Sequence, residues 1–175
     1  MRSGLIDSRP VMNREPLPGQ RLKPEDFDRV VRLTPLVAID LIVRSPDGRV
    51  LMGRRTNEPA RGRFFVPGGR VTKNEPLAAA FRRISLAELG VEKSIQEGRF
   101  LGVYEHFYPT NNHQVAGFGT HYVVLAYELP SAEKDLVLPH DQHGEFAWLT
   151  EADLLRSPEV HQNTKAYFLR GRAGG

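Results

Sequence analysis

The chain contains no cysteine, which excludes disulfide bonds and thiolate metal ligands. Any metal ion would therefore have to be bound by oxygen or imidazole groups. No apolar run approaches the roughly 20 residues that a membrane-spanning helix needs. The N-terminal stretch 1–20 is polar and lacks the apolar centre of a signal peptide, so we expect a cytoplasmic protein without a membrane partner.

Lysine is scarce, because only five of the 24 basic residues are lysine and 19 are arginine. The formal net charge of +3 is too small to argue for nucleic-acid binding, and we expect no such partner. The planar guanidinium of arginine suits bidentate binding of phosphate. A general preference for arginine explains most of these residues equally well, so only the arginines near a glycine turn are candidates for function.

The 175 residues suffice for one domain with a sizeable core. We expect a flexible N-terminal segment over residues 1–22, which are polar and rich in proline, glycine and arginine, and a single domain over residues 23–175. Strand-like runs dominate this domain, and they cover residues 36–43, 50–52, 64–66, 98–108, 120–129 and 146–149.

Helices are expected at both ends of the domain and at its centre. Pro24 opens the first, and the central helix runs over residues 75–89, with Asn74 as its N-cap and Gly90 at its end. Thr150 caps a short helix, and a last one begins at Ser157 and ends near residue 169. Together these elements predict an α+β fold, an α/β/α sandwich around a mixed β-sheet.

A glycine turn joins a short apolar strand to the central helix through Pro67, Gly68 and Gly69. Glycine lets the backbone approach a ligand closely and point its polar groups at an ion. The start of the following helix offers free N–H groups to phosphate oxygens. A carboxylate farther along that helix, such as that of Glu88, can hold a divalent cation. The segment therefore predicts a site for a metal-bound diphosphate.

From Gly69 onward, this segment resembles the Nudix box, whose pattern is G-x5-E-x7-R-E-U-x-E-E-x-G-U, with U an aliphatic residue. The matching positions are Gly69, Glu75, Arg83, Glu88, Gly90 and Val91. Ile84 and Ala87 stand where metal-binding glutamates are expected, and Ser85 stands where an aliphatic residue is expected. Since Glu88 is the only metal-binding glutamate of the box pattern that remains, we expect a single metal ion. The reaction centre could then lie away from phosphorus, or the site could be inactive.

Segments around the box are similar to the GDP-mannose mannosyl hydrolase branch of the Nudix superfamily, over roughly residues 25–170. They are residues 65–71, 102–108, 120–125 and 138–143. The resemblance implies a Nudix-like fold, a homodimer, and Mg²⁺-dependent hydrolysis of GDP-mannose or GDP-glucose at the sugar carbon C1. The products would be GDP and free sugar.

The resemblance also implies residue roles. Glu88, the carbonyl of Gly68 and Gln142 would bind Mg²⁺. His143 would be the general base that activates water, because a group with a pKa near neutrality suits that task. His121 and His140 are the alternatives to His143.

Arginines would bind the diphosphate and stabilise charge on the departing GDP. By the resemblance these are Arg55 and Arg70. Arg54 could exchange roles with Arg55, since alternation along a strand sends only one of the two inward.

Four further residues are candidates for substrate binding: Asp40, Arg83, His106 and Tyr122. Asp40, inside an apolar strand, either forms a buried ion pair or binds sugar hydroxyls or a catalytic arginine. His106 contacts the substrate or is a hydrogen-bonded core histidine. Arg83 either orients Glu88 or touches phosphate, whereas Glu75 is expected to be structural.

Two other functions compete with C1 hydrolysis. One is a Nudix pyrophosphatase that cleaves the P–O–P bond of a nucleotide sugar, against which the missing carboxylates argue. The other is a non-catalytic module that binds a nucleotide sugar. The joint presence of Arg70, Glu88 and the pair Gln142-His143 favours catalysis, because a sensor needs no base.

Overall fold

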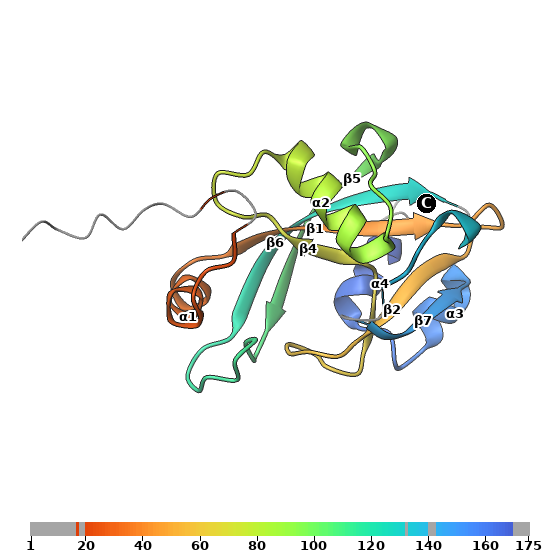
Figure 1. Cartoon of the computed structure of the whole chain (residues 1–175). Coiled ribbons are helices and arrows are strands. Elements are labelled where there is room, and N and C mark those ends of the chain that lie inside the picture. Colours follow the sequence, from red (N-terminus) through yellow and green to blue (C-terminus); the bar gives the residue numbers. More distant parts are fainter. Residues whose placement is uncertain (1–16, 18–19, 132, 140–142, 170–175) are drawn as a thin grey trace, which may run out of the picture.

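The computed structural model describes residues 17, 20–131, 133–139 and 143–169. In chain order, the elements are α1 (Pro24–Leu33), β1 (Leu36–Arg44), β2 (Val50–Arg55), β3 (Phe64–Phe65), β4 (Gly68–Arg70), α2 (Leu77–Leu89), η1 (Ile95–Glu97), β5 (Arg99–Tyr108), β6 (Thr120–Pro130), η2 (Glu133–Asp135), β7 (His143–Leu149), α3 (Glu151–Arg156) and α4 (Gln162–Leu169) (Figure 1). Within these ranges, none of the helices combines the length and the apolar character needed to cross a bilayer.

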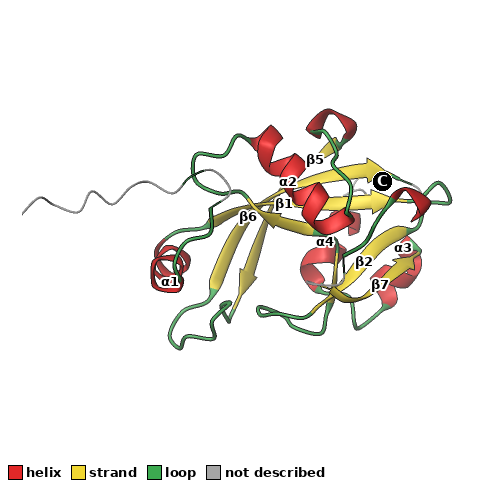
Figure 2. Ribbon diagram, in the orientation of Figure 1, coloured by secondary structure: helices red, strands yellow, loops and turns green. Residues whose placement is uncertain are grey.

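The strands form one mixed sheet with β1 at its centre. Its main path has the order β3-β2-β1-β6-β5, while β4 pairs with β1 and β7 pairs with β2 (Figure 2). β1 lies parallel to β6 along its whole length and antiparallel to β4. Within the described residues, β1 and β2 pair only next to the hairpin that joins them, where Arg44 pairs with Val50. The sheet therefore opens beyond this hairpin, and β4 occupies the other half of the same edge of β1.

Alternate residues of β1 are buried on opposite sides of the sheet. Ile39, Leu41 and Val43 belong to a core that includes α2, whereas Ala38 and Ile42 belong to a second core that includes residues of α3 and α4. Burial on both faces explains why β1 reads as an almost unbroken apolar run. The two cores confirm the predicted α/β/α sandwich, and they leave Asp40 on the side of α4.

Most elements lie where the sequence predicts them, and the exceptions have local causes. Thr150 caps α3 as expected, since its hydroxyl accepts a hydrogen bond from the Asp153 amide. α2 begins at Leu77 rather than near residue 75, because Pro76 has an extended conformation and Asn74 has φ +62°. α4 begins at Gln162 rather than at residue 157. The backbone of residues 159–161 instead hydrogen-bonds with Phe64 in β3.

Gly90 ends α2 in the left-handed conformation, with φ +70°. A Cβ added there would overlap the carbonyl oxygen of Val137 and lie 2.6 Å from its carbonyl carbon. The Val137 amide in turn donates to the Leu89 carbonyl at 2.9 Å. The segment around Val137, which precedes β7, is therefore hydrogen-bonded to the C-terminal end of α2. Gly90 is therefore required both by its backbone conformation and by the close approach of another backbone segment.

We expect Gly90→Ala to lower the free energy of unfolding by about 3 kcal/mol or more, because the strained φ adds to a backbone overlap. Gly48→Ala is the matched control, because Gly48 has φ +82° but nothing within 4 Å of the added Cβ. Gly48→Ala should lower the free energy of unfolding by only about 1 kcal/mol. Urea unfolding of both variants measures the difference, and equal losses would contradict the role assigned to the Val137 segment.

Candidate functional site

The segment that the sequence predicts as a glycine turn contains strand β4, which pairs with β1. We keep the name glycine turn for residues 67–69. Gly68 pairs with Asp40, and the Leu41 amide donates to the Pro67 carbonyl at 2.8 Å. A Cβ on Gly68 would overlap Asp40 Oδ1 and would lie 2.8 Å from the Ile39 carbonyl oxygen. Only glycine fits here, because the backbone of the turn occupies the space that a side chain would need. The contact places the Asp40 carboxylate against the backbone of Gly68, whose carbonyl the resemblance implies as a metal ligand.

Glu75 and Arg83 clamp the chain between the turn and α2. Arg83 donates to both carboxylate oxygens of Glu75, at 2.7 and 2.8 Å, and also to the Arg70 carbonyl at 2.8 Å. The amide and hydroxyl of Thr72 donate to the same carboxylate, each at 2.9 Å. The structural role expected for Glu75 agrees with these contacts. Those of Arg83 fix the backbone of Arg70, while its contact with phosphate stays a prediction.

The departures from the box pattern have distinct surroundings. Ile84 is buried, and its side chain would lie 3.1 Å from a Cβ added to Gly69, so it packs beneath the turn. The Ser85 hydroxyl accepts a hydrogen bond from the Lys93 amide at 2.8 Å. Ala87 is exposed on the helix surface. Of the three positions where the pattern expects metal-binding glutamates, only the position of Glu88 keeps a carboxylate. Glu88 is just 4% exposed.

Asp40 is the centre of a buried polar cluster. Burial raises its pKa from 3.8 to about 6, although a hydrogen bond from Tyr167 and the charge of Arg55 both act in the opposite direction. The charge of Glu88 also raises it, which shows that the two carboxylates interact. The Tyr167 hydroxyl donates to Asp40 Oδ2 at 2.6 Å. A cation bound near the two carboxylates would relieve their mutual repulsion.

Arg54 and Arg55 point in different directions, as strand alternation predicts. Arg54 forms surface ion pairs with Glu145 at 2.8 Å and with Glu159 at 3.4 Å. The Arg55 guanidinium instead lies 5.2 Å from the centroid of the Phe65 ring and interacts electrostatically with Asp40. Of the two arginines, Arg55 is thus the one that faces the polar cluster.

Arg70 projects from the end of the turn toward α1. Its guanidinium carbon lies 4.0 Å from the centroid of the Phe27 ring. Although Arg70 keeps an exposed surface, desolvation by its neighbours lowers its pKa, and the positive charges of Arg21 and Arg83 act in the same direction. Tyr122 acts in the opposite direction. Arg70 therefore lies near other cations, and its contact with phosphate stays a prediction.

The histidines differ in their placement. His106 is only 5% exposed, and its Nε2 lies 3.1 Å from the Tyr167 hydroxyl. These contacts agree with the expectation of a hydrogen-bonded core histidine, while a contact with the substrate stays a prediction. His121 stacks on the exposed Phe107 at 4.3 Å, on the opposite face of the sheet from Tyr122.

The expected base and one expected metal ligand fall at the edge of the described chain. His143 is the first residue of β7, and its backbone pairs with Arg55. This register brings the predicted base next to a predicted phosphate ligand. Gln142 and His140 lie outside the described residues. Throughout the described ranges, no group of three or more histidine, cysteine, aspartate and glutamate side chains could hold a metal ion.

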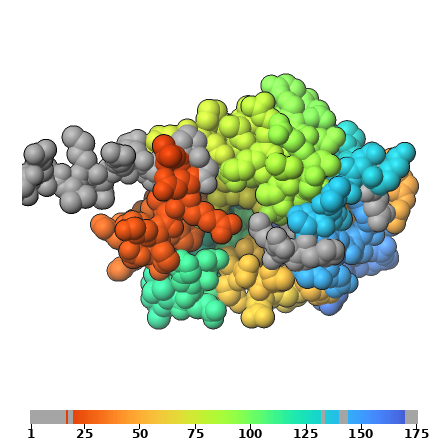
Figure 3. Space-filling view, viewed as in Figure 1, coloured from red at the N-terminus to blue at the C-terminus, as the bar shows by residue number. Residues whose placement is uncertain are grey.

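Several residues of this site were not predicted from the sequence. Tyr167 of α4 reaches Asp40 across 127 positions of the chain. His161 stacks on Phe65 with ring centroids 4.7 Å apart. His113, in the loop between β5 and β6, forms a hydrogen bond through Nδ1 with the Asp28 carboxylate of α1 at 2.6 Å. Figure 3 shows α1 and this loop side by side. The only available signal was a set of aromatic and polar residues in the terminal helices, which is equally typical of ordinary packing.

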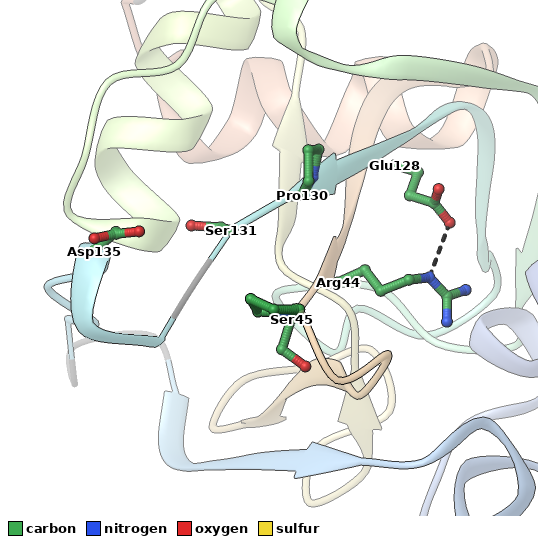
Figure 4. Close-up of a pocket in the computed structure, with 7 residues that line it drawn as sticks. Arg44, Ser45, Glu128, Pro130, Ser131 and Asp135 are labelled. Atoms are coloured by element: carbon green, nitrogen blue, oxygen red, sulfur yellow. Dashed lines mark hydrogen bonds and ion pairs between the residues drawn. The ribbon is translucent and has the colours of Figure 1, made fainter.

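A hollow of about 520 Å³ lies away from this cluster, at the far end of β1 (Figure 4). Its lining residues are Arg44, Ser45, Pro46, Glu128, Pro130, Ser131 and Asp135. Arg44 already donates to Glu128 at 3.1 Å and to the Gly48 carbonyl at 3.0 Å. Since Arg44 and Glu128 in this hollow pair with each other, we assign the chemistry to the cluster around Asp40.

Comparison with known proteins identifies relatives of the chain. The NUDIX domain family matches residues 34–170. The low-salt glycan biosynthesis protein Agl8 of Haloferax volcanii is 40% identical over 135 residues, which cover 77% of this chain and 83% of Agl8. An RNA pyrophosphohydrolase of Caulobacter vibrioides is 32% identical over 116 residues, covering 63% and 67% of the two chains. A MutT NUDIX hydrolase structure from Burkholderia pseudomallei superposes with a TM-score of 0.61 at 26% identity, covering 77% and 95%.

The clamp of Glu75 and Arg83 should stabilise the fold in a pH-dependent way. The hydrogen bonds from Arg83 lower the pKa of Glu75 from 4.5 to about 2. This stabilisation is fully present above the ordinary pKa and is lost as the pH falls toward the folded value. Glu75→Gln should therefore lower the free energy of unfolding by about 2 kcal/mol at pH 7, and roughly half of this difference should remain at pH 3.

Urea unfolding at both pH values measures this effect. Glu92→Gln is the control, because Glu92 is 61% exposed and lies 3.8 Å from Arg82. Its substitution should change the stability by less than about 0.5 kcal/mol. A Glu75→Gln loss that stays constant between pH 7 and pH 3 would show that the carboxylate charge is not the cause.

Proposed function

The chain belongs to the Nudix family, and we propose that it hydrolyses a GDP-hexose, GDP-mannose or GDP-glucose, at the sugar carbon C1. Water would attack C1, and the bond between C1 and the β-phosphate oxygen would break with its electron pair leaving on GDP. The proton released by the water would pass to His143. The products are GDP and the free sugar, with the configuration at C1 inverted.

The observation that carries this proposal is the reduced carboxylate set of the box. Ile84 packs into the core beneath Gly69, and Ala87 offers no ligand, so Glu88 remains alone among the three expected glutamates. Attack at phosphorus between two metal ions requires several carboxylates to hold both of them. Attack at C1 requires only a stabilised diphosphate leaving group and a base for the water.

The residues around Gly68 fit a single Mg²⁺ ion. A hard cation prefers oxygen ligands, and the turn brings the Gly68 backbone against the Asp40 carboxylate, which interacts with buried Glu88. Glu88 and the Gly68 carbonyl would hold the ion, together with Gln142, which we retain from the resemblance. When bound, Mg²⁺ would neutralise charge on the diphosphate and so stabilise the leaving group.

The arginines of the site would position the diphosphate. Arg55 faces Asp40, and the Arg70 backbone is held by the clamp while its side chain stacks on Phe27. Both guanidinium groups can donate bidentate hydrogen bonds to phosphate oxygens. Because these groups already stabilise departing GDP, the reaction needs no separate general acid, and His143 supplies the remaining function as base.

A sugar nucleotide is also consistent with the relatives. Agl8 is named as a glycan biosynthesis protein, and its 40% identity extends over 77% of this chain. A cytoplasmic homodimer that binds neither nucleic acid nor membrane remains part of the proposal. The alternative is cleavage of the P–O–P bond, which is favoured by the likeness to an RNA pyrophosphohydrolase at 32% identity.

Incubation with GDP-mannose and Mg²⁺, followed by chromatography and phosphorus NMR, tests the proposal. We expect GDP and free mannose, and a loss of at least about 100-fold in kcat for Glu88→Gln and for His143→Ala. GMP and mannose 1-phosphate would instead establish attack at phosphorus. Binding without turnover would identify a non-catalytic module.

The neighbouring arginines provide a matched pair in the same assay. Arg55→Ala should lower kcat by about 100-fold, because it removes charge stabilisation at the leaving group. Arg54→Ala should stay within about threefold of the wild type, because Arg54 is engaged with Glu145 and Glu159 on the surface. Equal effects of the two substitutions would contradict the placement of Arg55 in the site.

A further inference from the structure

Tyr167 connects three elements behind the candidate site. It belongs to α4 and is only 7% exposed. Its hydroxyl oxygen lies 2.6 Å from Asp40 Oδ2 in β1 and 3.1 Å from His106 Nε2 in β5. Its ring packs edge-on against the Tyr104 ring, with centroids 4.7 Å apart. The ring is thus held by the core while the hydroxyl meets two polar groups.

A phenol has one proton, so these two contacts cannot both be donated by Tyr167. The shorter distance, 2.6 Å, is typical of a hydroxyl that donates to a charged carboxylate. Burial and the charge of Asp40 raise the pKa of Tyr167 well above 10, so its proton is retained. The oxygen of Tyr167 is then left to accept a hydrogen bond from the second neighbour.

The donor in that second bond is His106. Burial, with a smaller contribution from the charge of His161, lowers the pKa of His106 to about 4, so the ring is neutral near pH 7. A neutral imidazole carries one N–H, and donation to Tyr167 places it on Nε2. Two hydrogen bonds therefore run in one direction, from His106 to Tyr167 and from Tyr167 to Asp40.

We propose that Tyr167 is a positioning residue, which orients the Asp40 carboxylate beside Gly68 and Arg55 through the hydrogen bonds that it shares with His106. The catalytic consequence rests on the proposed function. Asp40 is also surrounded by groups on other elements, namely Arg55 of β2, Glu88 of α2, Tyr108 of β5 and Tyr122 of β6. A carboxylate released from Tyr167 would turn toward Arg55 and draw it away from the diphosphate.

Tyr167→Phe tests the proposal, because it removes the hydroxyl and keeps the ring that packs on Tyr104. Tyr127→Phe is the control, since Tyr127 lies in the other core, edge-on to Phe81. Nitrogen NMR of the histidine rings in the full chain reports the tautomer of His106. Steady-state kinetics with GDP-mannose separates kcat from KM, and urea unfolding verifies that both variants are folded.

In the wild type we expect His106 to carry its proton on Nε2. Tyr167→Phe should shift the His106 ring nitrogens and lower kcat by about 10-fold to 100-fold, with KM within about threefold. Tyr127→Phe should leave the ring signals and kcat unchanged. This combination supports the proposal. A general loss of structure would not shift the His106 signals and lower kcat while leaving KM unchanged.

Three results would overturn the proposed role of Tyr167. A proton on Nδ1 of His106 in the wild type excludes the hydrogen-bond direction without reference to any variant. Unchanged His106 signals in Tyr167→Phe exclude the contact itself. Altered signals with unchanged kcat exclude the positioning role while the proposed function stands. If the wild type does not hydrolyse GDP-mannose, the proposed function fails separately, and the NMR results still decide whether the contacts of Tyr167 exist.

Discussion

The close approach of Gly68 to Asp40 is the constraint on which the rest of the site depends. The backbone of the turn occupies the space of a side chain at Gly68, and it hydrogen-bonds to β1 on either side of that contact. A buried carboxylate is costly unless it finds charge or hydrogen-bond partners. Arg55 and Tyr167 provide them, and each comes from a different element. Groups from β2 and α4 thus meet at a single acid of β1, beside the glycine turn.

Some residues of the box stabilise the fold, whereas another is a candidate for the chemistry. Glu75 and Arg83 hold each other and the Arg70 carbonyl, whereas Ile84 fills the space beneath Gly69. Under our proposal, Glu88 is the one carboxylate of the box that binds metal, and its charge interacts with that of Asp40. A Nudix scaffold can therefore keep its shape after losing box carboxylates, because the packing of Ile84 is independent of the metal. Under our proposal, the reaction then moves to C1, where one ion and two arginines suffice.

The sequence predicts local features well and long-range contacts poorly. Strand patterns and the end of α2 at Gly90 follow from residue types and short spacings, and the structure confirms these elements. Gly68 and Gly69 were expected in a turn, but they lie in strand β4 and pair with β1. Strand alternation also separates Arg54 from Arg55. Tyr167 could not be predicted as a partner of Asp40, since the two are 127 positions apart. The start of α4 differed because the chain before it pairs with Phe64 rather than with itself.

The most direct test of the central claim follows the oxygen of the attacking water. Turnover of GDP-mannose in water enriched with ¹⁸O, followed by mass spectrometry of both products, reports which bond is cleaved. Attack at C1 predicts one ¹⁸O atom in the released mannose and none in the phosphates of GDP. Incorporation of ¹⁸O into a phosphate group would contradict the account, because it would place the reaction centre at phosphorus.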